Sequence, residues 1–281
     1  MKILVTGSNG QLGNELQLIA KSSDWQFLFT DYEELDITDR DAVMKYFEAN
    51  KPDYCINCAA YTAVDKAETE KKLAHKINVA GAENLALGCK SVDATLFQIS
   101  TDFVFDGKAS SPVPEDKPTE PISYYGESKL LGEQKVSEVL ERHFTLRTSW
   151  LYSTFGNNFV KTMIRLSETK DELNIIADQI GTPTYARDLA NAIVEIIKTG
   201  STAYGLYHYS NEGVASWYDF TKAIFEYEEI QTKVNPIPTS QYPTPAARPA
   251  YSVMDKSKFK ETFGLEMPYW RESLKECLMN F

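Results

Sequence analysis

The sequence is poor in cysteine, in histidine and in positive charge. Its 29 Lys and Arg residues face 40 Asp and Glu residues, a net charge of -11 that argues against nucleic acid or an anionic membrane as a partner. Three histidines lie far apart without metal-ligand spacing, which argues against a zinc site and a histidine-based triad. The cysteines are too few for a secreted disulfide framework and favour a reducing compartment: Cys55, Cys58, Cys89 and Cys277.

Cys55 and Cys58 match a C-x-x-C motif, but they lie in an apolar, strand-like run, so we expect plain core cysteines. A long apolar run is also missing. No stretch approaches the roughly 18 uncharged apolar residues of a membrane span, and no cleavable apolar leader precedes Ile3. We therefore expect a cytoplasmic protein. With 43% hydrophobic and 25% charged residues, the 281 residues form one large or two modest globular domains.

Short apolar runs alternate with helical patterns through the first 150 residues, and strands are predicted near 2–6, 26–30, 53–58, 95–100 and 144–148. Leu12, Leu16 and Ile19 share one face of a predicted helix, and a second helix is predicted after an N-cap at Asp39. Strands that are apolar throughout are typical of a parallel sheet covered by helices on both faces. The sequence predicts a Rossmann-type, doubly wound α/β domain.

The pattern changes after residue 151. Two proline-rich segments, 112–121 and 235–249, argue against regular elements because proline lacks an N–H and fixes φ. Further helices are predicted at 158–167, 186–199, 216–228 and 270–280, and strands at 173–177 and 205–209. We predict a dinucleotide-binding domain over 1–151 with returning segments near 173–199, and a smaller interleaved substrate-binding domain over most of 152–281.

The first candidate site is a glycine-rich turn between the first predicted strand and helix: Gly7, Gly10 and Gly13. Such glycines permit a tight turn and let the backbone approach a pyrophosphate, which the N–H groups of the helix N-terminus bind. The spacing G-x-x-G-x-x-G differs from the G-x-G-x-x-G of most dehydrogenases. A plain turn is the alternative, because glycine spacing alone is a weak signal.

Asp31 follows the second predicted strand, where an acid binds the hydroxyls of the adenosine ribose. A carboxylate there opposes a 2′-phosphate, and no Lys or Arg lies between Asp31 and Asp39, so NADH is favoured over NADPH. A solvated turn residue is the alternative. Asp36 and Ile37 are candidates for the adenine end, and residues 57–62 end the third predicted strand where the backbone passes the cofactor.

Tyr125 and Lys129 stand at i and i+4 and share one face of a predicted helix. An ammonium near a phenol stabilises the phenolate, so we expect Lys129 to lower the pKa of Tyr125 and make it a usable proton donor. Thr101 ends the fourth predicted strand, at the edge where α/β sheets bind ligands. A Tyr–Lys pair alone is commonly surface decoration, but the three residues together predict a proton-transfer site.

These motifs resemble those of the extended short-chain dehydrogenases/reductases. Longer strings extend the resemblance nearly end to end and are similar to the dTDP-4-dehydrorhamnose reductases within that family: residues 59–68, 100–105, 125–133, 147–150, 156–159 and 242–249. The resemblance implies reduction of the C4 keto group of dTDP-4-dehydro-6-deoxy-L-mannose to dTDP-L-rhamnose with NADH or NADPH. It implies that Tyr125 protonates the C4 oxygen, that Lys129 holds the nicotinamide ribose, and that Thr101 binds the same sugar oxygen.

The resemblance also implies contacts with both ligands. Cofactor-contacting positions are matched by Gly10, Gln11, Leu12, Asp31, Asp36, Ile37, Ala60, Tyr61 and Thr62. Substrate-contacting positions are matched by Thr101, Asp102 and Trp150, and the loop of Arg248 is placed on the nucleotide-sugar side. Arginine suits a diphosphate because its geometry is bidentate. The alternatives are a core aromatic for Trp150 and a solvated surface residue for Arg248.

The chain departs from some relatives at a metal site. Some family members dimerise through a magnesium ion held by glutamates; Glu15 matches one of those positions, but Arg187 occupies another. Because a cation repels a metal ion, we predict no metal site and favour a monomer over a metal-bridged dimer.

Two other functions remain open from the sequence. A nucleotide-sugar 4-epimerase or 4,6-dehydratase shares the motifs, although a dehydratase typically has a second acid where Phe103 follows Asp102. A non-catalytic regulatory subunit, similar to the β subunit of methionine adenosyltransferase, belongs to a different class. The presence of Thr101, Tyr125 and Lys129 argues against such a subunit.

Overall fold

Six parallel strands form the main sheet of the computed structural model, which describes residues 1–281. They are β1 (Lys2–Thr6), β2 (Gln26–Thr30), β3 (Tyr54–Asn57), β4 (Thr95–Thr101), β5 (His143–Thr148) and β10 (Gly205–His208). Their spatial order is β10-β5-β4-β3-β1-β2. The predicted strands of the first 150 residues are confirmed to within a residue or two, and so is the doubly wound α/β class.

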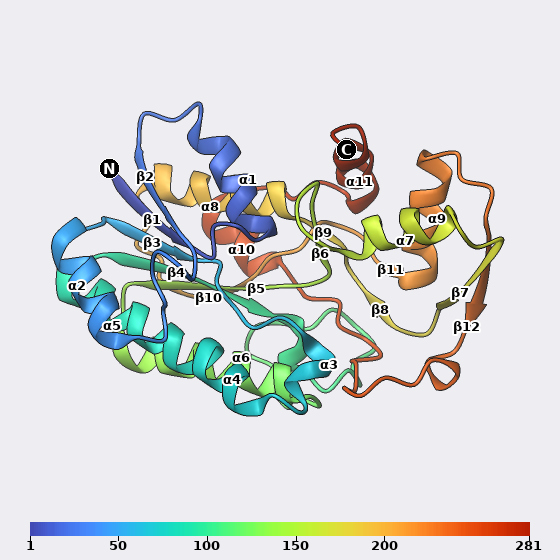
Figure 1. The fold of residues 1–281 in the computed structure, drawn as a ribbon, viewed down its shortest axis with the longest axis horizontal. Helices are drawn as coiled ribbons and strands as arrows, with labels where there is room; N and C mark the ends of the chain where they lie inside the picture. The colour runs from blue at the N-terminus through green and yellow to red at the C-terminus, as the bar shows by residue number, and fades with distance from the viewer.

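Helices cover both faces of this sheet (Figure 1). One face carries α1 (Gln11–Ala20), α8 (Ala186–Thr199) and α10 (Ser257–Phe263), and the other carries α2 (Arg40–Asn50), α5 (Ala82–Val92) and α6 (Tyr124–Val139). Ile3 and Val5 pack into the first core and Leu4 into the second, since alternate side chains of a strand point to opposite faces. This double burial explains why the strands are apolar throughout.

The helix start predicted at Asp39 is confirmed, because its carboxylate accepts a hydrogen bond of 3.0 Å from the N–H of Ala42. The region between β3 and α5 was not predicted. It holds α3 (Val64–Ala67), α4 (Lys71–His75) and a π-helical turn (Lys76–Gly81). These short elements lack the repeated apolar spacing that marks a long helix.

The C-terminal layer holds α7 (Phe159–Ser167), α9 (Trp217–Tyr227) and α11 (Trp270–Leu278). Three strand pairs accompany them: β6 (Leu151–Tyr152) with β9 (Thr184–Tyr185), β7 (Glu172–Ile176) with β12 (Lys233–Ile237), and β8 (Ile180–Gly181) with β11 (Ala215–Ser216). The layer has its own core, which includes Tyr152, Tyr185, Phe220 and Trp270. In Figure 1 it lies beside the main sheet, beyond the ends of β4 and β5.

Two sequence predictions need correction here. Of the segments predicted to return to the dinucleotide-binding domain near 173–199, α8 packs on the main sheet, whereas β7 pairs with β12 in the C-terminal layer. The main sheet also gains β10, which pairs with β5. The segment 235–249 does contain a regular element at its start. Pro236 lies within β12, and a two-stranded sheet tolerates it because one edge of each strand needs no partner.

All four cysteines are free. Three are buried in the cores as expected, whereas Cys58 is only partly buried and lines the cavity described below. None of the helices combines the length and the apolar character needed to cross a membrane.

Candidate active site

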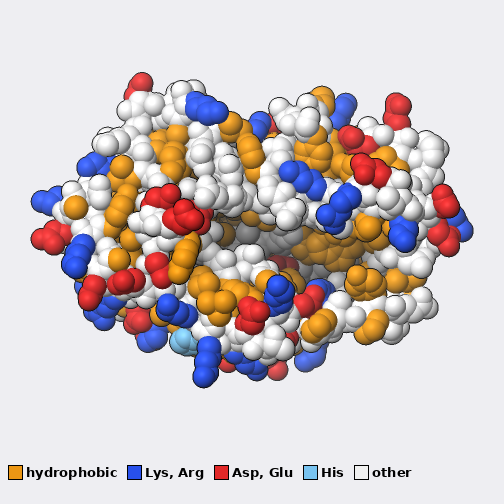
Figure 2. All heavy atoms as spheres, in the orientation of Figure 1, with side chains coloured by type: hydrophobic (Ala, Val, Ile, Leu, Met, Phe, Trp, Pro, Cys, Tyr) orange, Lys and Arg blue, Asp and Glu red, His pale blue; other side chains and the backbone are white.

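The carboxyl ends of the main strands open into a cavity of about 940 Å³ that the C-terminal layer closes on its other side. Figure 2 shows the molecule hollowed there, with hydrophobic side chains along part of the wall. The strand order of the sheet reverses at β1, because β2 lies on one side of β1 and β3 on the other. The cavity lies at this point, where open α/β sheets bind ligands. The predicted residues that line it are Gly7, Gly10, Gln11, Leu12, Asp31, Asp36, Ile37, Ala60, Thr62, Thr101, Asp102, Tyr125, Lys129, Trp150 and Arg248.

Two predicted cofactor residues do not line the cavity. Tyr61 turns its side chain away and donates a hydrogen bond of 2.6 Å to Glu70. Gly13 lies under the glycine-rich turn, where a Cβ would come within 2.5 Å of the backbone of Ser8. Gly13 therefore allows close contact between the turn and α1. Ala60 and Thr62, on either side of Tyr61, line the cavity, whereas Tyr61 itself does not.

The glycine-rich turn is shaped for close backbone approach. Gly7 has a φ of +64°, and a Cβ on it would lie 2.5 Å from the N atom of Ala59. Gly10 precedes α1, and no side chain caps that helix. The N–H groups of its first turn therefore stay available to an anion in the cavity.

Asp31 directly follows β2 and holds the glycine-rich turn by a hydrogen bond. Its Oδ2 accepts a hydrogen bond of 2.9 Å from the N–H of Asn9, and its Oδ1 accepts one of 2.8 Å from the N–H of Tyr32. Asp36, also on the cavity wall, accepts from the N–H and the hydroxyl of Thr38. Two carboxylates thus give this end of the cavity a negative character.

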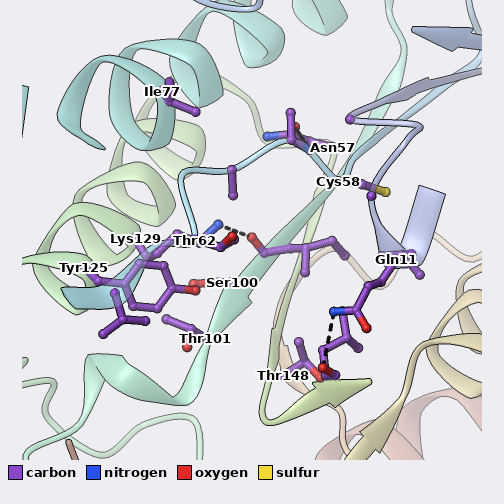
Figure 3. Close-up of a pocket in the computed structure, with 18 of the residues that line it drawn as sticks. Gln11, Asn57, Cys58, Thr62, Ile77, Ser100, Thr101, Tyr125, Lys129 and Thr148 are labelled. Atoms are coloured by element: carbon purple, nitrogen blue, oxygen red, sulfur yellow. Dashed lines mark hydrogen bonds between the residues drawn. The ribbon is translucent and has the colours of Figure 1, made fainter. Parts of the chain in front are cut away.

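The start of α6 places Tyr125 and Lys129. Ser123 caps the helix by accepting from the N–H of Gly126 at 3.3 Å, and the N–H of Tyr124 donates to Glu68 at 2.8 Å. Figure 3 shows Tyr125, Lys129, Thr101 and Ser100 gathered at one end of the cavity. The structure thus brings together the three residues predicted for proton transfer.

The pKa of Tyr125 lies above its ordinary value, whereas the spacing to Lys129 predicted a pKa below it. Burial raises the pKa of Tyr125 to about 12, with a smaller opposing effect of a hydrogen bond with Thr101 and a further raising effect of Asp102. The ammonium of Lys129 donates to the carbonyl oxygen of Ile99 at 2.7 Å instead. Burial lowers the pKa of Lys129 to about 8, although the charge of Glu133 opposes this. Tyr125 is therefore a protonated phenol at neutral pH, the form that a proton donor needs.

Asp102 is buried next to these residues with one oxygen free. Its Oδ1 accepts from the hydroxyl of Thr101 at 3.1 Å, while its Oδ2 has no partner. Burial raises the pKa of Asp102 to about 6, because the charged carboxylate is disfavoured away from water, and the hydrogen bond from Thr101 opposes this effect only in part. A buried oxygen without a partner is costly, so the geometry favours a ligand hydroxyl there.

Trp217 also contributes to the site and was not predicted from the sequence. Its indole, at the start of α9, stacks on that of Trp150 with ring centroids 3.5 Å apart and an interplanar angle of 8°. Trp150 has a φ of +46°, which is strained for a residue other than glycine, and a Cβ on Gly181 would touch its ring at 2.7 Å. Both indoles line the cavity and form an apolar wall. No sequence spacing links two tryptophans that lie so far apart in the chain.

Two hydroxyls at the strand ends were also missed. Ser100 on β4 and Thr148 on β5 line the cavity, and both hydroxyl oxygens are buried without a partner. A polar residue at the end of an apolar strand was the only available signal.

Comparisons with known proteins agree with this geometry. The family model described as the RmlD substrate binding domain matches residues 1–281. A relative from Aggregatibacter actinomycetemcomitans named dTDP-4-dehydrorhamnose reductase is 41% identical, over 98% of this chain and 97% of its own. This chain belongs to the dTDP-4-dehydrorhamnose reductase family.

Solved structures of the dTDP-4-dehydrorhamnose reductase family have the same fold. One from Clostridium acetobutylicum is 47% identical, has a TM-score of 0.97 and covers 100% of this chain and 99% of its own. One from Bacillus anthracis, solved in complex with NADP, is 42% identical, has a TM-score of 0.95 and covers 99% of both chains. The central sheet and the C-terminal layer are therefore common to the family.

The position that resembles the family's metal site is occupied by an ion pair. Glu15 is buried; one carboxylate oxygen accepts from Arg187 at 2.9 Å and the other from the hydroxyl of Ser153 at 2.6 Å. The structure contains no group of three or more His, Cys, Asp or Glu side chains arranged so that they could hold a metal ion. These residues do not fit a magnesium ion, because the guanidinium already neutralises the carboxylate.

A buried charged network lies behind the site. Arg147 on β5 donates to both oxygens of Glu133, at 2.9 and 2.7 Å, and Glu133 lies one helical turn beyond Lys129 on α6. His208 on β10 packs beside Arg147, with ring and guanidinium nitrogens 3.5 Å apart. Burial, reinforced by Arg147, lowers the pKa of His208 to about 3, so this histidine is neutral in the folded protein.

The network predicts a loss of stability in mild acid. An unfolded chain protonates His208 near its ordinary pKa of 6.5, whereas the folded chain does so only near 3, so stability falls as the pH drops below 6.5. Between pH 7.5 and 5 this linkage should cost about 2 kcal/mol. Urea unfolding at both pH values measures it.

The variant His208→Gln should show a smaller decrease in the free energy of unfolding over the same interval. The control is His75→Gln, which changes an exposed histidine of α4 and should match the wild type. An identical decrease in His208→Gln and wild type would show that His208 is not kept neutral by its surroundings.

Proposed function

We propose that this protein reduces the C4 keto group of dTDP-4-dehydro-6-deoxy-L-mannose and so produces dTDP-L-rhamnose. The observation that carries the proposal is one cavity that holds both a glycine-rich dinucleotide turn and the group of Thr101, Tyr125 and Lys129. Family membership over the full chain supports the same reaction.

The residues present fit a nicotinamide coenzyme. The uncapped start of α1 suits a pyrophosphate, and the glycine-rich turn that precedes it lines the cavity through Gly7 and Gly10. We place the ribose of the adenosine at Asp31 and the nicotinamide ribose at Lys129. When bound, the reduced coenzyme supplies the hydride for C4 of the sugar.

The chain's own residues handle the proton and the charge. Tyr125, protonated at neutral pH, donates its proton to the C4 oxygen, and Thr101 holds that oxygen by a hydrogen bond. The negative charge left on Tyr125 is stabilised by the ammonium of Lys129 on the same face of α6. A lysine with a pKa near 8 remains largely charged at pH 7 and serves this purpose.

Asp102, Trp150 and Arg248 are the proposed contacts to the nucleotide sugar. The free Oδ2 of Asp102 suits a sugar hydroxyl, and the wall formed by Trp150 and Trp217 suits the apolar face of a 6-deoxy sugar. Arg248 suits the diphosphate because a guanidinium binds phosphate oxygens in pairs.

We further propose that NADH is preferred and that the enzyme is a cytoplasmic monomer. Asp31 and Asp36 line the adenosine end, and their charges oppose a 2′-phosphate. The pairing of Glu15 with Arg187 leaves no ligand set for a bridging metal. Four free thiols suit a reducing compartment.

The variant Tyr125→Phe tests the reaction. It should lower kcat by at least about 100-fold because it removes the proton donor, while the Kd of NADH stays within about twofold of the wild type. Absorbance at 340 nm with the keto sugar gives the rate, and fluorescence titration gives the Kd.

The matched control is Tyr124→Phe, which removes the neighbouring phenol that does not line the cavity and should keep the wild-type rate. If Tyr125→Phe retained most of its activity, another group would have to donate the proton.

The variant Asp31→Ala tests the coenzyme preference. Removing the carboxylate should raise the ratio of kcat/KM for NADPH to that for NADH by about tenfold, because a 2′-phosphate no longer meets a fixed negative charge. Glu33→Ala is the control, since Glu33 is an exposed acid near Asp31 that does not line the cavity. An unchanged ratio in Asp31→Ala would mean that Asp31 does not contact the ribose.

A further inference from the structure

Arg248 makes an ion pair with Asp65 at the edge of the cavity. Its NH1 and NH2 groups donate to Oδ1 and Oδ2 of Asp65 at 3.1 and 2.8 Å. The exposed fractions are 23% for the Arg248 side chain and 40% for that of Asp65, so the pair is partly screened from water. The guanidinium also holds the pKa of Asp65 below its ordinary value. A two-point contact of this kind fixes the plane of the guanidinium as well as its position.

The contacts leave one edge of Arg248 free. Besides Asp65, NH1 donates to the hydroxyl of Thr244 and to the carbonyl oxygen of Ala246. A guanidinium has five N–H donors in a plane, and no protein atom accepts from Nε or from the second N–H of NH2. Those two donors lie side by side on one edge of the plane. Arg248 lines the cavity and Asp65 does not, so the carboxylate holds the arginine from outside.

Asp65 also holds the backbone of the loop that carries Arg248. Its Oδ1 accepts from the N–H of Ala246 at 3.1 Å. Just beyond Arg248, the N–H of Tyr251 donates to the carbonyl oxygen of Gly107 at 3.1 Å. The loop is thus pinned on both sides of Arg248. Asp65 lies on α3, which directly follows residues 57–62 at the end of β3.

We propose that Asp65 is a positioning residue for the nucleotide sugar. It holds the end of the guanidinium and so points the free edge of Arg248 into the cavity, where that edge binds the diphosphate through two parallel hydrogen bonds. The proposal rests on the proposed function, because it assumes that Arg248 meets the diphosphate. A fixed arginine loses less conformational freedom on binding than a mobile one, so losing Asp65 weakens the diphosphate contact without touching the reacting atoms.

The test compares binding of dTDP and of thymidine, which lacks the diphosphate, to the full chain with NADH present. Calorimetry should show that Asp65→Asn raises the Kd of dTDP by about threefold to tenfold and leaves the Kd of thymidine unchanged. With the keto sugar, KM should rise by a similar factor while kcat stays near the wild-type value. A purely structural defect would instead lower kcat and the melting temperature together.

Three further variants make the result specific. Asp65→Asn combined with Arg248→Gln should bind dTDP no more weakly than Arg248→Gln alone, because Asp65 acts only through Arg248. Arg248→Lys keeps a positive charge beside Asp65 but has no second edge, so it should bind dTDP as weakly as Arg248→Gln. Asp93→Asn is the control; it removes a similar ion pair, with Arg142, outside the cavity.

The possible results distinguish an error in the role proposed for Asp65 from an error in the proposed substrate. If wild-type protein fails to bind dTDP, the proposed nucleotide-sugar substrate is wrong. If Arg248→Gln weakens dTDP but Asp65→Asn does not, the role of Asp65 is wrong and the substrate stands. Tighter binding of dTDP by Asp65→Asn would also overturn the inference, because Asp65 would then compete with the diphosphate. If Arg248→Lys bound dTDP with wild-type affinity, the proposal that one edge of Arg248 binds Asp65 and the other binds the diphosphate would be wrong.

Discussion

The buried ammonium of Lys129 is the constraint on which the site depends. An ammonium removed from water destabilises the fold unless hydrogen bonds and opposite charge compensate it. Here the carbonyl oxygen of Ile99 accepts one hydrogen bond, and Glu133 supplies negative charge one turn along α6. Glu133 is itself held by Arg147 on β5. The network therefore fixes α6 to the main sheet and, with it, the place of Tyr125.

The protein's own groups compensate this ammonium and its polar neighbours only in part. The pKa of Lys129 stays below and that of Tyr125 above the ordinary value, and Asp102, Ser100 and Thr148 keep buried oxygens without partners. Buried oxygens without a hydrogen-bond partner favour ligands whose hydroxyl or amide groups can form the missing hydrogen bonds. The cavity is thus polar where the sheet ends and apolar along the two indoles, as a site for a sugar and a nicotinamide requires.

Much of the main sheet and of the site could be predicted from the sequence, for identifiable physical reasons. Parallel strands buried on both faces are apolar throughout, and the glycines and the Tyr125–Lys129 spacing are local patterns. Contacts between distant segments could not be predicted. They include the stack of Trp150 on Trp217 and the pairing of Pro236 within β12. The raised pKa of Tyr125 could not be predicted either, because it depends on the burial of the phenol in the folded chain, where the ammonium of Lys129 donates to Ile99.

Reduction of the keto sugar by this protein is tested by the loss of absorbance at 340 nm when the purified protein is mixed with NADH, or separately NADPH, and enzymatically generated dTDP-4-dehydro-6-deoxy-L-mannose. We expect coenzyme oxidation that depends on the keto sugar and is faster with NADH. Folded protein that binds NADH but oxidises neither coenzyme in the presence of this sugar would show that the protein is not a reductase of this sugar.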